Sequence, residues 1–467
     1  MDTKLLKQKI LDLAIRGKLV PQDPNDEPAS ILLEKIRKEK QELIKQGKIK
    51  KDKNESTIFV GDDKQHYEKM IEEQPLNWTV IRLNEVLYYE QPTNYIVTNT
   101  EYCDSYKTPV LTAGKSFILG YTNEATGIYN NLPCIIFDDF TTDSKFVDFP
   151  FKVKSSAMKI LTNNKYVSLK FIYYSMQTID CIVDTHKRFW ISDYSNKPVY
   201  LPPLAEQQKI VEKIEELFAQ VDKIEEEKQS LLKLIDKAKD KVLDLAMKGK
   251  LVKQDPNDEP ASVLLEKIFE EKKKLAKEGK IKLSKDELLE PQISDDNDYY
   301  RQFIEPKLIL KYPKVDNWNK LTLNQICISI STKEYQIKSS EIKSIGQYPV
   351  ISQGEQFIDG YCETTKYLDK IPCIIFGDHT RVVKYIDFPF VVGADGTKCL
   401  YPYINHKFFY FLIKYYSSFI KNRGYARHFS YLSSFIFYIH SSFKIQEQIS
   451  AQVENLLNKI EQIKDSL

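Results

Sequence analysis

The sequence predicts an α+β protein in which two strand-rich domains are separated by two long antiparallel coiled-coil helices, one of them split between the N- and C-termini. Three observations predict this fold. Residues 11–50 match residues 243–282 at 30 of 40 positions, so the chain is an internal duplication. Apolar residues recur at alternating spacings of four and three along one segment, which is typical of a coiled-coil seam. The remaining segments are short apolar runs broken by Gly, Pro, Asn and Asp, which indicates strands.

Composition limits the classes of protein. A chain of 467 residues that is 42% hydrophobic is long enough for about three domains with real cores. No run of about 18 apolar residues occurs, and the first residues are amphipathic, so we expect a cytoplasmic protein with no membrane partner. The seven cysteines form no CxxC pair, which disfavours a zinc site and a disulfide framework. The net charge of +2 means that a polyanion would have to be bound by local clusters.

The elements follow in an order that the duplication repeats. An N-terminal helical region, residues 1–74, contains a charged helix at 28–46, with Pro28 in its first turn and Gly47 after its end. A strand-rich domain occupies residues 75–202. The central helical region, 203–314, contains a long helix at 203–247 and a second charged helix at 260–278. The second strand-rich domain spans 315–442, and a C-terminal helical region spans 443–467.

The seam of the long helix is formed by ten apolar residues, interrupted only at Lys228: Ile210, Ile214, Leu217, Val221, Ile224, Leu231, Ile235, Ala238, Val242 and Leu245. Residues 449–467 align with residues 210–228, and residues 2–16 align with the other end of the same helix. The second long helix is therefore expected to be cut in two, with the termini meeting and the two copies related by a pseudo-twofold axis. A simple dimerisation coil is the alternative interpretation of this seam.

Both strand-rich domains keep a framework and change their surface. The strings LPCIIFDD (132–139) and IPCIIFGD (371–378) correspond, as do VDFPF (147–151) and IDFPF (386–390), while most positions between such anchors differ. Cys134 and Cys373 are expected to be packing residues within these strands, and Trp78 and Trp318 to be core anchors. A duplicated framework with diversified surfaces suits the recognition of two different ligands at a fixed separation.

Several strings resemble the DNA-specificity subunit of Type I restriction-modification systems. These are RGKLVPQDPNDEPAS, PPLAEQQKIVEKIEELF, YPVISQGEQFIDGY and IIFGDHTRVVKYIDFPFVVGADGTK. One departure is that the second copy has SSFKIQEQI (441–449) where the first has PPLAEQQKI (202–210). The resemblance implies that residues 75–202 and 315–442 are target-recognition domains, each recognising one half of a split, asymmetric double-stranded DNA sequence.

The resemblance also implies the partners. The helical regions would hold two methyltransferase subunits, and restriction/translocase subunits would join the complex. S-adenosylmethionine, ATP and Mg would serve those partners, with no cofactor in this chain. The charged helices at 28–46 and 260–278 are either docking surfaces for these subunits or solvated faces.

Candidate DNA-binding residues lie in loops where the copies differ or where hydrogen-bond donors cluster. In the first domain they are Gln91, Thr93, Asn94, Tyr95, Thr141, Thr142, Lys145, His186, Lys187 and Arg188. In the second domain they are Ser331, Thr332, Lys333, Tyr335, His379, Thr380, Arg381, Lys384, Arg423, Tyr425, Arg427 and His428. Arg188 and Arg427 occupy equivalent positions, and structural ion pairs are the alternative interpretation of both.

Catalytic signatures are weak, and we expect no catalytic residues. AGKS at 113–116 lacks the first glycine of a phosphate loop and is predicted to be a turn. The six histidines show no HExxH spacing, and no GxSxG elbow or GxGxxG motif occurs. Asp138-Asp139 becomes Gly377-Asp378 in the second copy, so a nuclease centre that uses both carboxylates would survive in one half alone. The sequence thus favours a non-catalytic DNA-binding subunit. The alternatives are a duplicated nuclease or methyltransferase with an unrecognised active site, and an adaptor that never touches DNA.

Overall fold

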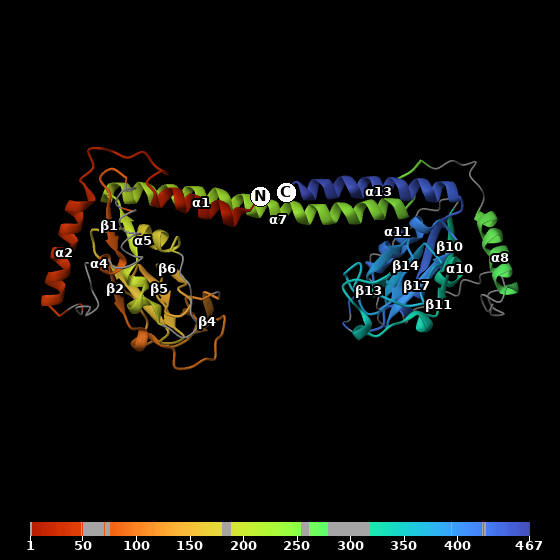
Figure 1. Ribbon diagram of the computed structural model, residues 1–467, viewed down its shortest axis with the longest axis horizontal. Coiled ribbons are helices and arrows are strands. Elements are labelled where there is room, and N and C mark those ends of the chain that lie inside the picture. The colour runs from red at the N-terminus through yellow and green to blue at the C-terminus, as the bar shows by residue number, and fades with distance from the viewer. Residues whose placement is uncertain are drawn as a thin grey trace. The chain divides into compact units, whose positions relative to one another are not determined.

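The computed structural model (Figure 1) describes residues 2–47, 49, 70, 75–114, 116–179, 188–253, 261–278, 318–393, 395–422, 424 and 426–467. The chain divides into two compact units, unit 1 from Met1 to Lys228 and unit 2 from Gln229 to Leu467. Each unit is described by itself. Helices and strands occur together in both, which confirms the predicted α+β class.

Outside the strand-rich domain, the described helices of unit 1 are α1 (Thr3–Ile15), α2 (Ala29–Lys45) and the first part of α7 (Leu204–Met247), as predicted. The carboxylate of Asp2 accepts hydrogen bonds from the first backbone amides of α1 and so caps it. Thr3 donates to Glu225 at 2.8 Å, and Lys7 pairs with Asp222 at 2.6 Å. Because the residue numbers rise along α1 while they fall along α7, the two helices are antiparallel.

The strand-rich domain of unit 1 contains a four-stranded sheet in the order β2-β8-β5-β6, a three-stranded sheet β4-β3-β7 and a pair β1-β9. All neighbours are antiparallel except β3 and β7. Its elements are β1 (Thr79–Arg82), α4 (Leu83–Val86), β2 (Leu87–Glu90), η1 (Pro92–Tyr95), β3 (Thr108–Leu111), β4 (Ile118–Thr122), β5 (Cys134–Asp138), β6 (Ser144–Val147), β7 (Lys152–Val153), β8 (Met158–Asn163), α5 (Leu169–Met176), α6 (Phe189–Ser192), η2 (Tyr194–Asn196) and β9 (Pro198–Leu201).

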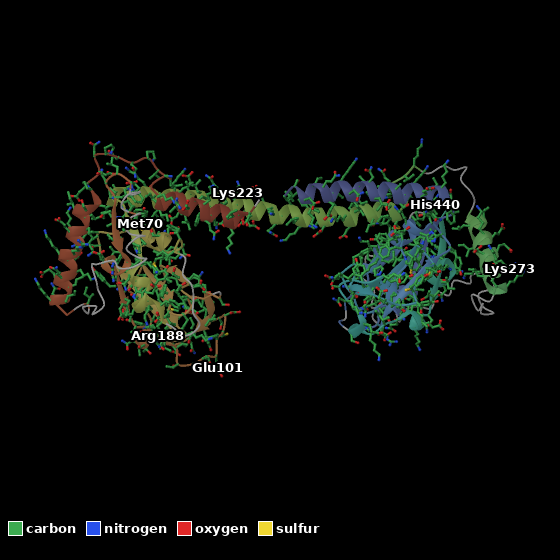
Figure 2. All side chains as sticks on the ribbon, viewed as in Figure 1. Met70, Glu101, Arg188, Lys223, Lys273 and His440 are labelled. Carbon is green, nitrogen blue, oxygen red and sulfur yellow. The ribbon has the colours of Figure 1, made fainter. Side chains whose placement is uncertain are left out.

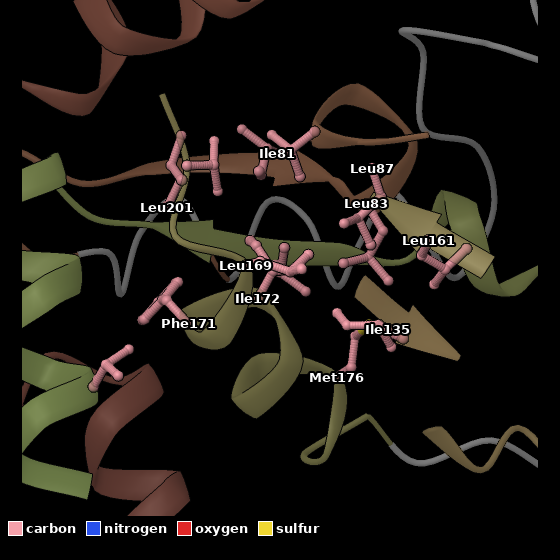
Figure 3. Packing of buried hydrophobic residues seen from close by; sticks show 14 of the residues in the cluster. Ile81, Leu83, Leu87, Ile135, Leu161, Leu169, Phe171, Ile172, Met176 and Leu201 are labelled. Carbon is pink, nitrogen blue, oxygen red and sulfur yellow. The ribbon is translucent and has the colours of Figure 1, made fainter. Parts of the chain in front are cut away.

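The core of this domain lies between the four-stranded sheet and α5. Figure 3 shows Phe171, Ile172 and Met176 of α5 among side chains from β1, β5 and β8. Trp78, 4% exposed, belongs to the same cluster and donates through Nε1 to Glu206 of α7 at 2.8 Å. The predicted anchor role of Trp78 is therefore confirmed, and this bond ties the start of the domain to the long helix. Cys134 is fully buried, as predicted.

Unit 2 repeats this topology strand by strand. Its sheets have the orders β11-β17-β14-β15, β13-β12-β16 and β10-β18, which correspond strand by strand to those of unit 1. The elements are α8 (Ala261–Lys277), β10 (Trp318–Thr322), α10 (Leu323–Ile326), β11 (Cys327–Ile330), η5 (Lys333–Tyr335), η6 (Ser339–Glu341), β12 (Tyr348–Ile351), β13 (Gly360–Cys362), β14 (Cys373–Gly377), β15 (Val383–Ile386), β16 (Val391–Val392), β17 (Thr397–Pro402), α11 (His406–Ser417), α12 (Phe429–Ser433), β18 (Ile436–His440) and α13 (Phe443–Asp465). The internal duplication is thus one of structure as well as sequence.

Helix α13 packs on the second part of α7. Lys239 pairs with Glu461, and Lys464 interacts electrostatically with Asp236, so this pair of helices is antiparallel too. Both parts of the split helix therefore run antiparallel to the part of α7 in their own unit. The meeting of the termini and the pseudo-twofold axis concern the relation between the units and stay predictions.

The apolar seam of α7 is buried in part. Ile210, Ile214, Val221 and Ile235 are buried, as its spacing predicts. Two seam residues near the middle of α7 are more open: Ile224 is 39% exposed and Leu231 is 38% exposed. In unit 1, Ile224 lies beside the first turn of α1, because its neighbour Glu225 is bonded to Thr3. A seam side chain next to the end of its partner helix has fewer residues to pack against, which explains the exposure.

A buried glutamine joins each domain to its long helix. In unit 1, Gln207 donates to Pro202 O at 2.9 Å and accepts the Ser168 amide, at the start of α5, at 2.8 Å. In unit 2, Gln446 donates to His440 O at 2.7 Å and accepts the Asn405 amide, at the start of α11, at 2.8 Å. The second junction thus keeps a buried glutamine that bonds to its domain in the same manner, although SSFKIQEQI lacks the two prolines and the accepting carbonyl lies one residue earlier.

Each charged helix is attached to its domain through one face. In unit 1, Lys40 of α2 is buried and donates to Asn84 O at 2.9 Å. In unit 2, Lys272 of α8 donates to Asn324 O at 2.7 Å. These faces are therefore structural.

The described strands of unit 1 fall within residues 75–202, and those of unit 2 fall within residues 315–442. The boundary between the two units lies inside α7, so the division of the chain into five parts stays a prediction.

Candidate nucleic-acid interface

The candidate site of each unit is one edge of the four-stranded sheet. In unit 1, Glu90 at the end of β2 pairs with Ile160, while Asp138 at the end of β5 pairs with Met158. The last residue of β2, the first of β8 and the last of β5 therefore lie at the same edge. In unit 2, Ile330 pairs with Cys399 and Gly377 with Thr397, which gives the same arrangement. The loops that leave this edge after β2 and β5, and after β11 and β14, contain part of the predicted DNA-binding set.

The central feature is the hairpin loop between β5 and β6, and its equivalent between β14 and β15. In unit 1 the Thr142 amide donates to Asp138 O at 3.0 Å. In unit 2 the Arg381 amide donates to Gly377 O at 2.8 Å. Thr142 has a φ of 61° and Arg381 a φ of 64°. Positive φ values of this kind are energetically costly for residues other than glycine. Both copies keep this strained turn at equivalent positions.

The two units fix the hairpin loop by different side chains. In unit 1 the Asp138 carboxylate accepts the amides of Phe140 at 2.9 Å and Thr141 at 3.0 Å. Unit 2 has Gly377 at this position, and Gln353 from the loop after β12 accepts the His379 amide at 2.9 Å instead. A Cβ at Gly377 would lie 2.1 Å from Thr380 Oγ1, so the glycine makes room for this arrangement.

A buried carboxylate ties a second loop to the hairpin loop. The carbonyl of Asp139 accepts the Phe189 amide, and its carboxylate accepts the Trp190 amide, both at 2.9 Å. In unit 2, the carbonyl of Asp378 accepts the His428 amide at 2.7 Å, and its carboxylate accepts the Phe429 amide at 2.8 Å. The residues immediately before these anchored segments are Arg188 and Arg427, and both are exposed. Figure 2 shows Arg188 at the end of its domain remote from the α1–α7 pair.

Lys159 connects a third loop, which follows β2, to the hairpin loop. This lysine is fully buried, pairs with Asp139 at 2.9 Å and donates to Gln91 Oε1 at 3.3 Å. Thr93 and Asn94, on the short helix η1, are exposed, while Tyr95 is half-buried and donates to Glu90 at 2.9 Å. Burial and that hydrogen bond raise the pKa of Tyr95, so its hydroxyl is neutral at pH 7. One ion pair thereby connects all three loops of unit 1.

The corresponding loop of unit 2 carries Ser331, Thr332, Lys333 and Tyr335 at and before η5. Ser331 and Lys333 are exposed, and Thr332 and Tyr335 are half-buried. Tyr335 packs on a cluster of buried residues of unit 2. His379 and Thr380 lie at the tip of the hairpin loop of this unit, where Thr380 is exposed, as is Thr141 in unit 1.

Three of the predicted residues have structural contacts instead. Lys384 is 4% exposed and donates to Ser352 O at 2.8 Å, and burial lowers its pKa. His428 is completely buried against Asp378 O, at 2.9 Å from Nδ1. The guanidinium of Arg381 donates to Ile420 O. The expectation that Lys384 and His428 lie on the binding surface is therefore wrong, because the interior carbonyls that they contact hold them inside. Lys145, equivalent to Lys384, is half-buried in β6.

Four predicted residues, His186, Lys187, Arg423 and Tyr425, lie outside the described residues. Two contributors were missed by the sequence analysis. Gln353 fixes the loop of unit 2 from 26 residues away, and no local signal identifies it. Phe140 is 40% exposed at the tip of the hairpin loop of unit 1. The sequence repeat aligns Phe140 with His379, so this position could have been recognised as one at which the two copies differ.

Among the described residues, no group of three His, Cys, Asp or Glu side chains is placed to hold a metal ion. Lys115 of the AGKS segment lies outside the described residues; on either side of this segment the Thr112 amide donates to Phe117 O at 3.0 Å, which agrees with a turn between β3 and β4. No helix in the described part of the chain is long and apolar enough to cross a membrane.

Comparisons with known proteins identify the first domain. Residues 75–234 match the family model described as the Type I restriction modification DNA specificity domain. The chain is 50% identical over 144 residues to the specificity subunit of the Type I restriction enzyme EcoR124I/EcoR124II of Escherichia coli, which covers 29% of this chain and 35% of that subunit. It is 32% identical over 363 residues to the EcoEI specificity subunit of Escherichia coli, covering 63% of this chain and 58% of that subunit.

The chain thus spans less than two thirds of the length of these curated relatives. Among solved structures it is similar to the HsdS subunit from Thermoanaerobacter tengcongensis, at 13% identity and a TM-score of 0.44, covering 84% of this chain and 92% of that chain. Residues 75–234 thus match the Type I restriction modification DNA specificity domain, and the chain is similar over part of its length to specificity subunits of Type I restriction enzymes.

Proposed function

We propose that this chain is a non-catalytic, sequence-specific subunit that binds double-stranded DNA and recognises a bipartite, asymmetric target. One observation carries the proposal: the same sheet edge is built twice on the same topology, with different residues at the loop tips. Two domains with the same sheet topology but different residues at their loop tips are suited to recognise two different half-sites. The match of residues 75–234 to a DNA specificity domain supports DNA as the ligand.

The chemistry of the edge fits a duplex. Arg188 and Arg427 are exposed at equivalent positions, and arginine binds phosphates and guanine edges. Exposed Thr93, Asn94 and Thr141 add short polar side chains in unit 1. Because the net charge of the chain is +2, attraction to DNA must come from such local groups, and binding should weaken as salt rises.

The partners and cofactors form part of the same proposal. The relatives are named specificity subunits of Type I restriction enzymes, which supports assembly with two methyltransferase subunits and with restriction/translocase subunits. S-adenosylmethionine, ATP and Mg would be bound by those partners. The helical regions outside the recognition domains would hold the methyltransferase subunits, and the complex would act in the cytoplasm, where the DNA is.

The test exchanges one domain at a time. Residues 75–202 are replaced by the corresponding domain of a relative, the full system is expressed in cells, and methylated sites are mapped by sequencing. One half of the recognised sequence should change while the other is retained, and exchange of residues 315–442 should change the opposite half. A change in both halves after a single exchange would refute independent recognition.

A second experiment tests for catalysis. The purified chain alone is incubated with DNA, Mg²⁺ and S-adenosylmethionine. Cleavage or methyl transfer without added subunits would favour the enzymatic alternative, a duplicated nuclease or methyltransferase. A gel shift in a salt series, with and without the partner subunits, excludes an adaptor that never touches DNA if a salt-sensitive complex forms.

A further inference from the structure

The hairpin loop of unit 1 presents an aromatic ring to solvent. Phe140 is 40% exposed, and it belongs to none of the hydrophobic clusters found among the described residues. A single exposed phenylalanine is not unusual on a protein surface. Its location is informative, because it lies at the tip of a loop whose neighbours on both sides are held by hydrogen bonds.

The backbone at Phe140 is fixed from three directions. Its own amide and that of Thr141 donate to the Asp138 carboxylate. On the other side, Asp139 is 1% exposed and pairs with the buried Lys159. Thr142 completes the turn with a positive φ. The ring is therefore carried on a rigid support, which reduces the entropy lost when it contacts a ligand.

The backbone of an exposed arginine lies close to the backbone of Phe140. The Phe189 amide donates to Asp139 O, so the residue before Phe189 and the residue after Asp139 flank the same hydrogen bond. These flanking residues are Arg188 and Phe140. In unit 2 the bond from His428 to Asp378 O is flanked in the same way by Arg427 and His379. Each unit thus places an arginine beside a residue that differs between the units.

We propose that Phe140 and His379 are specificity-determining residues of their half-sites, an inference that rests on the proposed function. Phe140 has no hydrogen-bonding group, and the apolar feature of the major groove is the C5-methyl group of thymine. Phe140 therefore packs against a thymine methyl. His379, with a ring that donates or accepts hydrogen bonds, contacts a polar base edge. The arginine common to both units binds the adjacent phosphate or base and sets the distance.

The first test needs no variant. After the recognised sequence has been mapped, each thymine of the half-site specified by unit 1 is replaced in turn by uracil, which lacks the C5-methyl group. Binding of these duplexes by the wild-type complex is compared. One replacement should weaken binding by about fourfold, the effect expected for one buried methyl group. Equal binding of all duplexes, or a half-site without thymine, would overturn the assignment of Phe140.

Variants then connect the effect to the residue. In Phe140→Ala the sensitive thymine should lose its preference over uracil, whereas Leu76→Ala, a control at a residue 59% exposed near the start of the domain, should keep it. In Phe140→His, mapping of methylated sites should show a changed preference at one or two base pairs of the first half-site alone. His379→Phe should act in the same way on the second half-site.

The outcomes separate the two proposals. If wild type and Leu76→Ala modify a bipartite site and Phe140→His modifies the identical site, the specificity role of Phe140 is refuted and the proposed function stands. If the wild-type complex shows no sequence preference at all, the proposed function fails first. A melting curve for each variant distinguishes lost recognition from lost folding, and the uracil series remains decisive if Phe140→His does not fold.

Discussion

The ion pair between Asp139 and Lys159 gives the sharpest prediction about stability. Its atoms are 2.9 Å apart, with side chains 2% and 0% exposed. The equivalent atoms in unit 2, on Asp378 and Lys398, are 3.9 Å apart, and the Lys398 side chain is 35% exposed. The same replacement, lysine to methionine, therefore removes a fully buried partner in one unit and a partly exposed, more distant one in the other. The equivalent replacement in unit 2 is therefore a matched control for the replacement in unit 1.

Lys159→Met leaves the Asp139 carboxylate buried without its cation, and such losses cost about 3–5 kcal/mol. Lys398→Met should cost less, because its ammonium group is 3.9 Å from the carboxylate and its side chain is 35% exposed, so the charge pair that is lost is weaker. For a unit of this size the first value corresponds to a fall in melting temperature of roughly 6–20 °C. A double variant, Asp139→Asn with Lys159→Met, removes both charges and keeps an acceptor for the Trp190 amide, so it should recover much of the loss.

The assay is urea unfolding followed by tryptophan fluorescence. Trp78 and Trp190 report on unit 1, and Trp190 is bonded to Asp139 itself. Because the pair also holds Gln91, Lys159→Met should weaken recognition of the first half-site even under conditions where the chain stays folded. If Lys159→Met and Lys398→Met destabilise the chain equally, the reasoning from burial is refuted.

Three further predictions follow from single contacts. Burial alone would raise the pKa of Glu124, but hydrogen bonds from neighbouring amides and side chains outweigh burial and lower the pKa from 4.5 to about 2. The ionised carboxylate therefore stabilises the fold above pH 4.5, and this stability should be lost as the pH falls from 4.5 to 2. In Glu124→Gln this acid-dependent loss, about 1 kcal/mol after allowance for solvent screening, should vanish from acid unfolding curves. Gly377→Ala should destabilise unit 2 by about 1–3 kcal/mol and weaken the second half-site alone, whereas Gly354→Ala, where a Cβ meets nothing within 4 Å, should be neutral in melting and binding. Deletion of residues 2–15, which removes the buried face of α1, should lower the melting temperature far more than Lys7→Ala, and equal melting of the two variants would contradict the packing of α1 on α7.

The sequence by itself determined the helices and the duplication. A seam residue repeats every three or four positions because the helix turns at that interval, so α7 and α13 are visible in the spacing alone. The caps of α2 follow from Pro28 and Gly47, which act through their own backbone. Strand-rich domains at 75–202 and 315–442 were likewise predicted from short apolar runs. All these signals are local, since each depends on residues within a few positions of one another.

The tertiary structure alone decided which loop residues face a ligand. Lys145 and Lys384 align in the repeat, yet Lys384 is enclosed because the carbonyls of the loop after β12 surround its ammonium group. Gln91 meets Lys159 across 68 positions of sequence, and Gln353 meets His379 across 26. Such contacts depend on the order of strands in the sheet, which no spacing encodes. The exposure of Phe140 was decided in the same way, because burial of a side chain depends on what distant segments place around it.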